Sequence, residues 1–194
     1  MKKALLVFAA GVLMFTGASC KKSDRVNYGN FKVINDTTVT MNGVINGRTE
    51  DRFDKLISDH PKINTIILED CPGSKNDDEN LRVSKKIYDQ GINTMLRSNS
   101  EIASGAVDLF LAGNKRSYEP GAKVGVHSWS GGGKTATDYA EDHENHKPYI
   151  DYYKYVGMTE EEAKDFYFFT IKAAPADGIH WMTEEELEAY NFVR

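Results

Sequence analysis

Cysteine is scarce in this chain of 194 residues, which contains only Cys20 and Cys71. Two cysteines offer no disulfide framework if Cys20 is modified, so the fold must depend on packing. Basic residues are also outnumbered, because 24 Lys and Arg stand against 29 Asp and Glu, for a formal net charge of −5. That balance argues against a nucleic-acid partner, whose phosphates require a basic surface. Internal repeats and low-complexity tracts are missing as well.

Long apolar runs are limited to residues 4–15, a stretch too short to span a bilayer comfortably. In "MKKALLVFAAGVLMFTGASC" this run follows Lys2 and Lys3 and precedes small residues ahead of Cys20. The order resembles a bacterial lipoprotein signal, in which the cysteine is lipidated and becomes the new N-terminus. We therefore expect loss of residues 1–19, lipid on Cys20 and a membrane-anchored location in the bacterial cell envelope. An ordinary secretory signal is the alternative.

Removal of residues 1–19 would leave 175 residues (194 minus 19) with a net charge of −7. This length is enough for one well-cored domain and too short for two. Residues 20–28 are polar, so they are expected to form a tether. The single domain is then expected to span residues 29–194.

Strand and helix patterns alternate along the chain. Strands are expected within residues 31–45, 64–70, 92–98 and 123–129. Helices are expected over residues 49–60, 76–91 and 104–113, with Thr49 as the cap of the first. Two more are expected between residues 149 and 174, with a break near Gly157. The tail is expected to form a short strand followed by a last helix. The alternation predicts an α/β fold with a mostly parallel sheet. Ligands in such sheets bind beyond the carboxyl ends of strands, which draws attention to the expected turns at residues 69–74 and 98–105.

Residues 100–113, "SEIASGAVDLFLAG", place Ser104 where an apolar helix begins. One interpretation is a helix N-cap, since a serine hydroxyl readily accepts a hydrogen bond from the first turn. The other is a nucleophile, because small neighbours admit a carbonyl and the Gly105 N–H can face an oxyanion. Capping serines are far commoner than catalytic ones. Other residues of the chain are therefore needed to distinguish the capping serine from the nucleophile.

Gly73, Ser104 and His127 follow one another at separations of 31 and 23 residues. In this order they resemble the proteolytic subunit of the Clp protease and its extracytoplasmic relatives, over most of residues 39–194. The matching segments are "NGVI", "LEDCPGS", "ASGAVDLFLAG", "VGVH" and "WMTEEELEAYNFV". The resemblance implies the Clp/crotonase-like fold of repeated β-β-α units with a mostly parallel sheet, and it implies peptide hydrolysis.

The resemblance also implies roles for individual residues. Ser104 would attack a carbonyl, and His127 would take the serine's proton and return it to the leaving group. The backbone N–H groups of Gly73 and Gly105 would bind the oxyanion.

The chain departs from the family pattern at two places. Pro72 occupies the position of the first of two paired glycines. The family's aspartate falls on Ile179, so Asp177, two residues away, is the candidate for the third catalytic residue. A Ser-His dyad remains the alternative.

Other motifs suggest weaker alternatives. "ASG" also resembles the signal peptide peptidases that pair serine with lysine, for which Lys134 or Lys147 would be the base. His143 and His146 in "EDHENH" have the spacing of one face of a metal site, but the segment is more typical of solvated polar chain. We therefore expect no metal and no cofactor. "SGGGK" lacks phosphate-loop spacing and is expected to form a rim beside His127.

These patterns favour an extracytoplasmic serine hydrolase, most simply a peptidase acting on peptide or other acyl substrates, and able to form a homo-oligomer. The rival is a catalytically silent Clp-fold binding or scaffold lipoprotein. A crotonase-like enzyme acting on acyl thioesters shares the implied fold, but its chemistry uses no nucleophilic serine.

Overall fold

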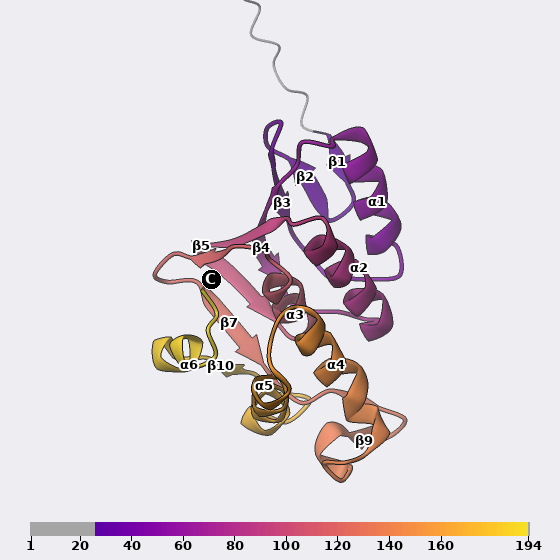
Figure 1. Cartoon of the computed structure of the whole chain (residues 1–194), viewed down its shortest axis with the longest axis vertical. Coiled ribbons are helices and arrows are strands. Elements are labelled where there is room, and N and C mark those ends of the chain that lie inside the picture. Colours follow the sequence, from indigo (N-terminus) through magenta and orange to yellow (C-terminus); the bar gives the residue numbers. More distant parts are fainter. Residues whose placement is uncertain (1–25, 194) are drawn as a thin grey trace, which may run out of the picture.

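A sheet of eight strands forms the centre of the protein in a computed structural model that describes residues 26–193 (Figure 1). Its strands are β1 (Asn27–Tyr28), β2 (Phe31–Val33), β3 (Thr38–Met41), β4 (Thr65–Cys71), β5 (Asn93–Ala103), β6 (Arg116–Tyr118), β7 (Lys123–Val126) and β10 (His180–Trp181). A separate hairpin consists of β8 (Ser130–Gly131) and β9 (Lys134–Thr135).

The strand order is β1-β2-β3-β4-β5-β7-β10, with β6 also paired to β5. The pairs from β3 through β7 are parallel, whereas β1, β2 and β10 pair antiparallel at the two ends. The α/β fold with a mostly parallel sheet, predicted from the alternation of patterns, is therefore confirmed. Strand β5 lies in the interior of this order and leads directly into Ser104.

Helices pack around the sheet (Figure 1). They are α1 (Thr49–Asp59), α2 (Asp77–Asp89), α3 (Gly105–Leu111), α4 (Lys147–Tyr155), α5 (Glu160–Ala173) and α6 (Glu184–Ala189), with short 3-10 helices at Ala136–Asp138 and Glu144–His146. Helix α2 packs against α1, α3 and α4, and α4 packs against α5. Across residues 26–193, none of the helices combines the length and apolar character needed to cross a membrane.

Local sequence explains where α2 begins. Asn76 is its N-cap and accepts a hydrogen bond from the Glu79 N–H, and three acidic residues fill the first turn, where the helix dipole favours them. The predicted cap of α1 is wrong. Arg48 holds the N-cap position without a side-chain cap, while the Thr49 hydroxyl accepts from the Asn46 N–H at 3.0 Å.

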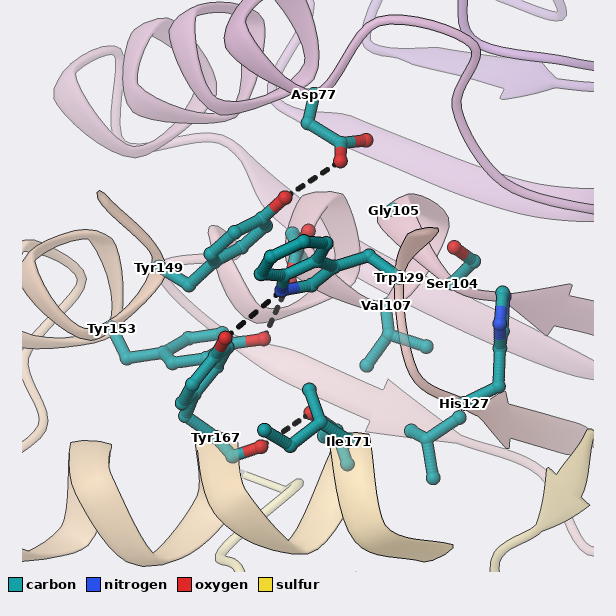
Figure 2. A pocket seen from close by; sticks show the side chains of 13 residues that line it. Asp77, Ser104, Gly105, Val107, His127, Trp129, Tyr149, Tyr153, Tyr167 and Ile171 are labelled. Atoms are coloured by element: carbon teal, nitrogen blue, oxygen red, sulfur yellow. Dashed lines mark hydrogen bonds between the residues drawn. The ribbon is translucent and has the colours of Figure 1, made fainter. Parts of the chain in front are cut away.

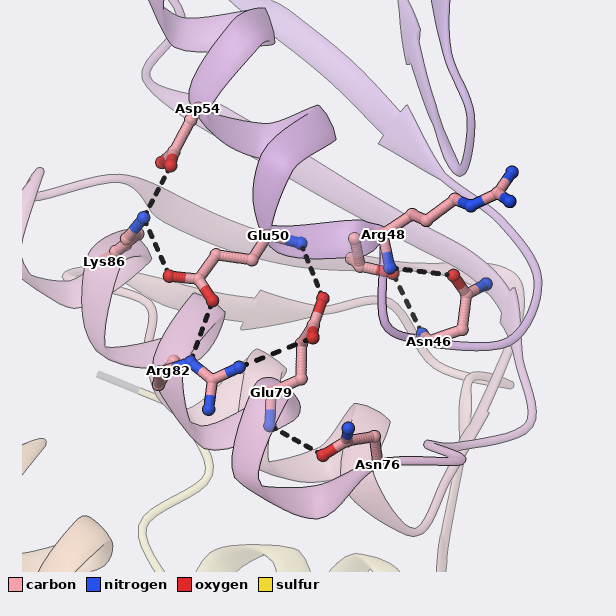
Figure 3. Close-up of polar contacts among 9 residues, drawn as sticks. Asn46, Arg48, Glu50, Asp54, Asn76, Glu79, Arg82 and Lys86 are labelled. Carbon is pink, nitrogen blue, oxygen red and sulfur yellow. Dashed lines mark hydrogen bonds and ion pairs between the residues drawn. The ribbon is translucent and has the colours of Figure 1, made fainter.

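Ion pairs join α1 to α2 (Figure 3). Glu50 contacts Arg82 and Lys86, each at 2.9 Å, and Lys86 also contacts Asp54 at 2.6 Å. The hydrogen bond from Lys86, followed by that from Arg82, lowers the pKa of Glu50. These side chains are partly exposed, so the pairs orient the two helices more than they stabilise them.

The core contains half of the eight aromatic residues of α4 and α5. Tyr152, Tyr153, Phe166 and Tyr167 are all buried. Cys71 is also buried and free, and burial raises the pKa of its thiol to about 12. The thiol therefore stays protonated near neutral pH and is not a nucleophile.

Two boundaries differ from those expected. The predicted tether, residues 20–28, overlaps β1, because the buried Tyr28 pairs with Phe31 and its hydroxyl donates to Asp59 at 2.8 Å. The turn expected at residues 98–105 is instead the second half of β5, which continues to Ala103. Cys20 and the predicted signal, residues 1–19, lie outside the described residues.

Arg116 ties the end of α3 to the C-terminal segment. It is only 5% exposed, and its guanidinium donates to the carbonyls of Leu111, Asn191 and Phe192 at 2.8 to 3.1 Å. The planar guanidinium spreads its donors over three nitrogens, each of which reaches a different carbonyl, whereas an ammonium has all its donors on one nitrogen.

We therefore expect Arg116→Lys to lower the free energy of unfolding by about 2–4 kcal/mol, because buried carbonyls lose their donors. Urea unfolding followed by circular dichroism measures the change. Arg97→Lys, at an exposed position of β5, is the control and should shift stability by less than about 0.5 kcal/mol. Equal effects of the two substitutions would show that Arg116 is not an anchor.

Candidate active site

Ser104 has an unusual backbone conformation, with φ 53° and ψ −132°. A positive φ is uncommon outside glycine, and such conformations cost about 1–3 kcal/mol. The conformation is held by hydrogen bonds from the Ser104 N–H to the Gly125 carbonyl at 3.0 Å and from the Val107 N–H to the Ser104 carbonyl at 2.8 Å. The Ser104 side chain makes no capping hydrogen bond. Ser104 therefore occupies the N-cap position of α3, as predicted, but the prediction that its hydroxyl caps the helix is wrong.

Gly73, in the loop after β4, lies directly against Ser104. Its φ is +125°, and a Cβ placed there would lie 2.8 Å from Ser104 Cβ and 3.3 Å from Ser104 Oγ. The loop is held by the Ile45 N–H, which donates to the Gly73 carbonyl at 2.9 Å. Only glycine fits this close approach of two backbones.

Gly105 is required for a different reason from the one expected. A Cβ at Gly105 would lie 2.7 Å from Ser74 Oγ and 2.8 Å from Asn80 Nδ2. The missing side chain thus lets the first turn of α3 pack against α2 and the loop before it. Within the described part of the chain, neither the Gly73 N–H nor the Gly105 N–H has a hydrogen-bond acceptor. Both N–H groups remain free to bind a ligand oxygen.

His127 follows the last residue of β7, and its Nδ1 lies 2.8 Å from the Ser128 carbonyl oxygen. A carbonyl oxygen can only accept, so Nδ1 carries the proton and Nε2 of the neutral ring has a lone pair. Ser104 and His127 line one pocket (Figure 2). The hydrogen bonds found among residues 26–193 do not include one between their side chains.

Asp177 lies in an exposed turn after α5. This segment is held near His127, because the Ser128 N–H donates to the Ala174 carbonyl at 2.9 Å. Asp177 makes no hydrogen bond to His127 in the described structure, where the Ser128 carbonyl takes the position at Nδ1. Its role as a third catalytic residue stays a prediction.

The two lysines of the alternative mechanism point elsewhere. Lys147 is 74% exposed, and its Nζ lies 4.0 Å from Asp151. Lys134 Nζ lies 4.8 Å from the centre of the Tyr139 ring. The pocket that contains Ser104 is not lined by either lysine. This placement favours His127 as the base.

His146 is not part of a solvated segment, so that prediction is wrong for this residue. It is buried, with Nδ1 2.7 Å from Tyr167 Oη and Nε2 3.0 Å from the Ala140 carbonyl. His143 lies outside this contact, and its ring is tilted by 45° against that of Tyr139, with ring centres 4.5 Å apart. Among the residues that the structure describes, no group of three or more His, Cys, Asp and Glu could hold a metal ion.

The pocket beside Ser104 is small, and four aromatic residues contribute to its lining (Figure 2). Its free volume is about 50 Å³. The lining residues are Asp77, Ser104, Gly105, Val107, Asp108, Val126, His127, Trp129, Tyr149, Tyr153, Tyr167, Thr170 and Ile171. The chain thus brings α2, α3, β7, α4 and α5 together around the serine.

Asp108, one turn after Ser104, is a site residue that the sequence patterns did not reveal. Its Oδ1 accepts from Tyr153 Oη at 2.7 Å, its Oδ2 from Asn80 Nδ2 at 3.0 Å, and its carbonyl from Tyr152 Oη at 2.6 Å. Burial raises the pKa of this carboxyl to about 7, although the hydrogen bonds from Tyr153 and Asn80 oppose the rise. The available signal was a lone acid within the apolar stretch "GAVDLFLAG".

No family model and no curated protein sequence matches the chain. Solved structures do match, among them a serine-to-alanine mutant of the 1510-N membrane-bound stomatin-specific protease. That match has 21% identity, covers 81% of this chain and 76% of the other, and has a TM-score of 0.53. A lysine-to-alanine mutant of the same protease, in complex with a substrate peptide, matches at 21% identity, 81% and 72% coverage and a TM-score of 0.51.

The fold is Clp/crotonase-like. At 21% identity the likeness to the stomatin-specific protease shows the fold alone. It confirms the part of the sequence resemblance that concerned architecture.

Strain at Ser104 can be tested with two substitutions. We expect Ser104→Gly to be more stable than Ser104→Ala by about 1 kcal/mol, because glycine adopts this positive φ without a Cβ clash. Urea unfolding of both variants measures the difference. The control pair is Ser98→Gly and Ser98→Ala, at an exposed strand position, where alanine should be the more stable by about 0.5–1 kcal/mol. The same order at both positions would contradict strain at Ser104.

Asp108 should make stability depend on pH. Its pKa rises from 3.8 to about 7 on folding, so the folded protein binds more protons than the unfolded chain between these values. The contribution of Asp108 to the free energy of unfolding is therefore fully present below about pH 4. It is lost as the pH rises to about 7, and the total loss is up to about 4 kcal/mol. Asp108→Asn lacks this contribution.

Urea unfolding of wild type and Asp108→Asn from pH 4.5 to pH 8 measures the effect. The stability difference, wild type minus variant, should decrease as pH rises. A difference that is constant across this range would contradict a raised pKa.

Proposed function

We propose that the protein is an extracytoplasmic, lipid-anchored serine hydrolase that cleaves peptides, with Ser104 as nucleophile and His127 as base. The observation that carries this proposal is the backbone of Ser104, strained at φ 53° beside a pocket that His127 also lines. Strained backbone of this kind gathers at catalytic residues, because the surrounding structure must hold it against its preference. The likeness of the fold to a protease supports the reaction class.

Each chemical step uses groups that line the pocket or lie against Ser104. Ser104 Oγ forms a bond to the carbonyl carbon while His127 Nε2 takes the hydroxyl proton. That proton passes to the leaving nitrogen as the C–N bond breaks, which leaves an ester on Ser104. Water then attacks the ester, His127 takes its proton, and the proton returns to Ser104 as the acid leaves.

The N–H groups of Gly73 and Gly105 are proposed as the donors to the oxyanion. Both lack acceptors within residues 26–193, and Gly73 lies close to Ser104 Oγ. Backbone donors that are already in place stabilise the developing charge without reorganisation. The position of Gly105 at the first residue of α3 adds the positive end of the helix dipole.

We propose a Ser-His dyad rather than a triad. The Ser128 carbonyl at 2.8 Å holds the proton on Nδ1, which is the orienting role that a carboxylate has in a triad. Asp177 is exposed and has no bond to His127 in the described structure. Its removal should therefore change catalysis little.

The rival function is a binding or scaffold protein that keeps the fold without turnover. Two observations favour it: Pro72 precedes Gly73, and no hydrogen bond joins Ser104 to His127 among the described residues. A direct test of serine reactivity separates the two functions.

A fluorophosphonate should label the folded protein at Ser104. Ser104 Oγ bonds to phosphorus, the P–F bond breaks, and fluoride leaves with the proton that His127 accepted. Labelling should be abolished in Ser104→Ala, reduced about 100-fold or more in His127→Ala, and unchanged in Asp177→Asn. Gel fluorescence and mass spectrometry of the labelled peptide measure these effects.

Glycine variants provide the matched control for the same labelling. Gly73→Ala should lose most labelling, because its Cβ would lie 2.8 Å from Ser104 Cβ. Gly131→Ala, whose Cβ would meet open space, should label like wild type. A folded wild-type protein that does not react between pH 7 and pH 8 would support the scaffold instead.

A further inference from the structure

Trp129 lines the same pocket as the proposed nucleophile, Ser104. It follows His127 by two residues, and its indole stacks on Tyr149 with ring centres 6.2 Å apart and planes 14° apart. Figure 2 shows the indole lying across the pocket, between the side chains of Tyr149 and Val107. The residual volume of about 50 Å³ is what remains with the indole in place.

The indole is fixed by a directional chain of hydrogen bonds. The Ala140 carbonyl can only accept, so His146 carries its proton on Nε2 and its Nδ1 accepts from Tyr167 Oη. Tyr167 Oη in turn accepts from Trp129 Nε1 at 2.9 Å. His146 is buried and Tyr167 is only 1% exposed, so the hydrogen bond between them is shielded from water, and Trp129 at the end of the chain is partly buried. The orientation of Trp129 is therefore a built feature of the fold.

The remaining space is too small for an aromatic side chain. An apolar cavity of about 150 Å³ accommodates benzene, and the pocket beside Ser104 offers a third of that. A volume of about 50 Å³ admits only a few non-hydrogen atoms. The side chains of alanine and serine meet this limit.

We propose that Trp129 is a specificity-determining residue that restricts the substrate to acyl groups with small side chains, such as those of alanine or serine. The inference rests on the proposed serine hydrolase function. The side chain next to the attacked carbonyl lies nearest to Ser104, and the pocket is lined by Ser104, His127 and the first turn of α3. Val107, Val126 and Ile171 give it apolar walls, which suit an uncharged side chain.

The test uses two peptidyl diphenyl phosphonates that differ only in the side chain beside phosphorus, a methyl group or a benzyl group. Ser104 Oγ bonds to phosphorus and one phenoxide leaves, taking as phenol the proton that His127 accepted. In wild type the methyl probe should inactivate at least about tenfold faster than the benzyl probe. In Trp129→Ala the two rates should come within a few-fold of each other, because the space for the ring is opened.

Trp181→Ala is the matched control. Trp181 is the other tryptophan of the chain, lies on β10 at the end of the sheet, is 39% exposed and does not line the pocket. This variant should keep the wild-type preference for the methyl probe. If Trp129→Ala does not fold, Trp129→Phe retains a ring beside Tyr149 and should show an intermediate ratio.

A fluorophosphonate without an amino-acid side chain separates the two hypotheses. If the fluorophosphonate labels the wild-type protein but the methyl and benzyl probes react at equal rates, the role of Trp129 is overturned. The proposed hydrolase function is then unaffected. A wild-type protein that reacts with none of the three reagents would overturn both.

Discussion

The conformation of Ser104 is the constraint on which the rest of the site depends. Strand β5 leads into this residue, and helix α3 begins at the next one, so the chain must change direction within a single residue at positive φ. The Gly125 carbonyl holds its N–H from the neighbouring strand, and Gly73 packs against its side chain. Each neighbour is a glycine because a Cβ would collide with the nearby chain. The strain is therefore supported by the sheet and the loop together.

A second set of contacts attaches the aromatic helices to the serine helix. Tyr153 of α4 and Asn80 of α2 donate to the Asp108 carboxyl, and Tyr152 of α4 donates to the backbone carbonyl of Asp108. A buried carboxyl surrounded by donors specifies one arrangement of these helices, because removing any partner leaves a polar group without water. The wall of the pocket formed by α4 is thereby held in place relative to Ser104.

The hydrogen-bond chain from His146 through Tyr167 to Trp129 likewise holds the wall of the pocket that Trp129 forms in place. The histidine that sequence reasoning assigned to a solvated segment has this structural role because the 3-10 helix at Glu144–His146 turns its ring inward. A short polar motif does not indicate which of its side chains is buried. That depends on contacts with α5, more than twenty residues away.

The sequence by itself determined the alternation of strands and helices, the order of Gly73, Ser104 and His127, and the small residues around the serine. These depend on local periodicity and on spacing along the chain, both of which can be read without coordinates. The Clp/crotonase-like fold followed from them by resemblance. The aromatic run of α4 and α5 is visible in the sequence, but the sequence does not show which rings face the serine.

Only the tertiary structure decided that the Ser104 side chain does not cap its helix, that Asp108 is buried beside it, and that Trp129 narrows the pocket. A serine before a helix has the same sequence pattern whether its φ is negative or positive, because the sign is set by the hydrogen bond to Gly125 and by the space left at Gly73. The burial of Asp108 and the direction of the Trp129 ring arise from partners on α2, α4 and α5. Such contacts join residues far apart in the chain, so no local pattern encodes them.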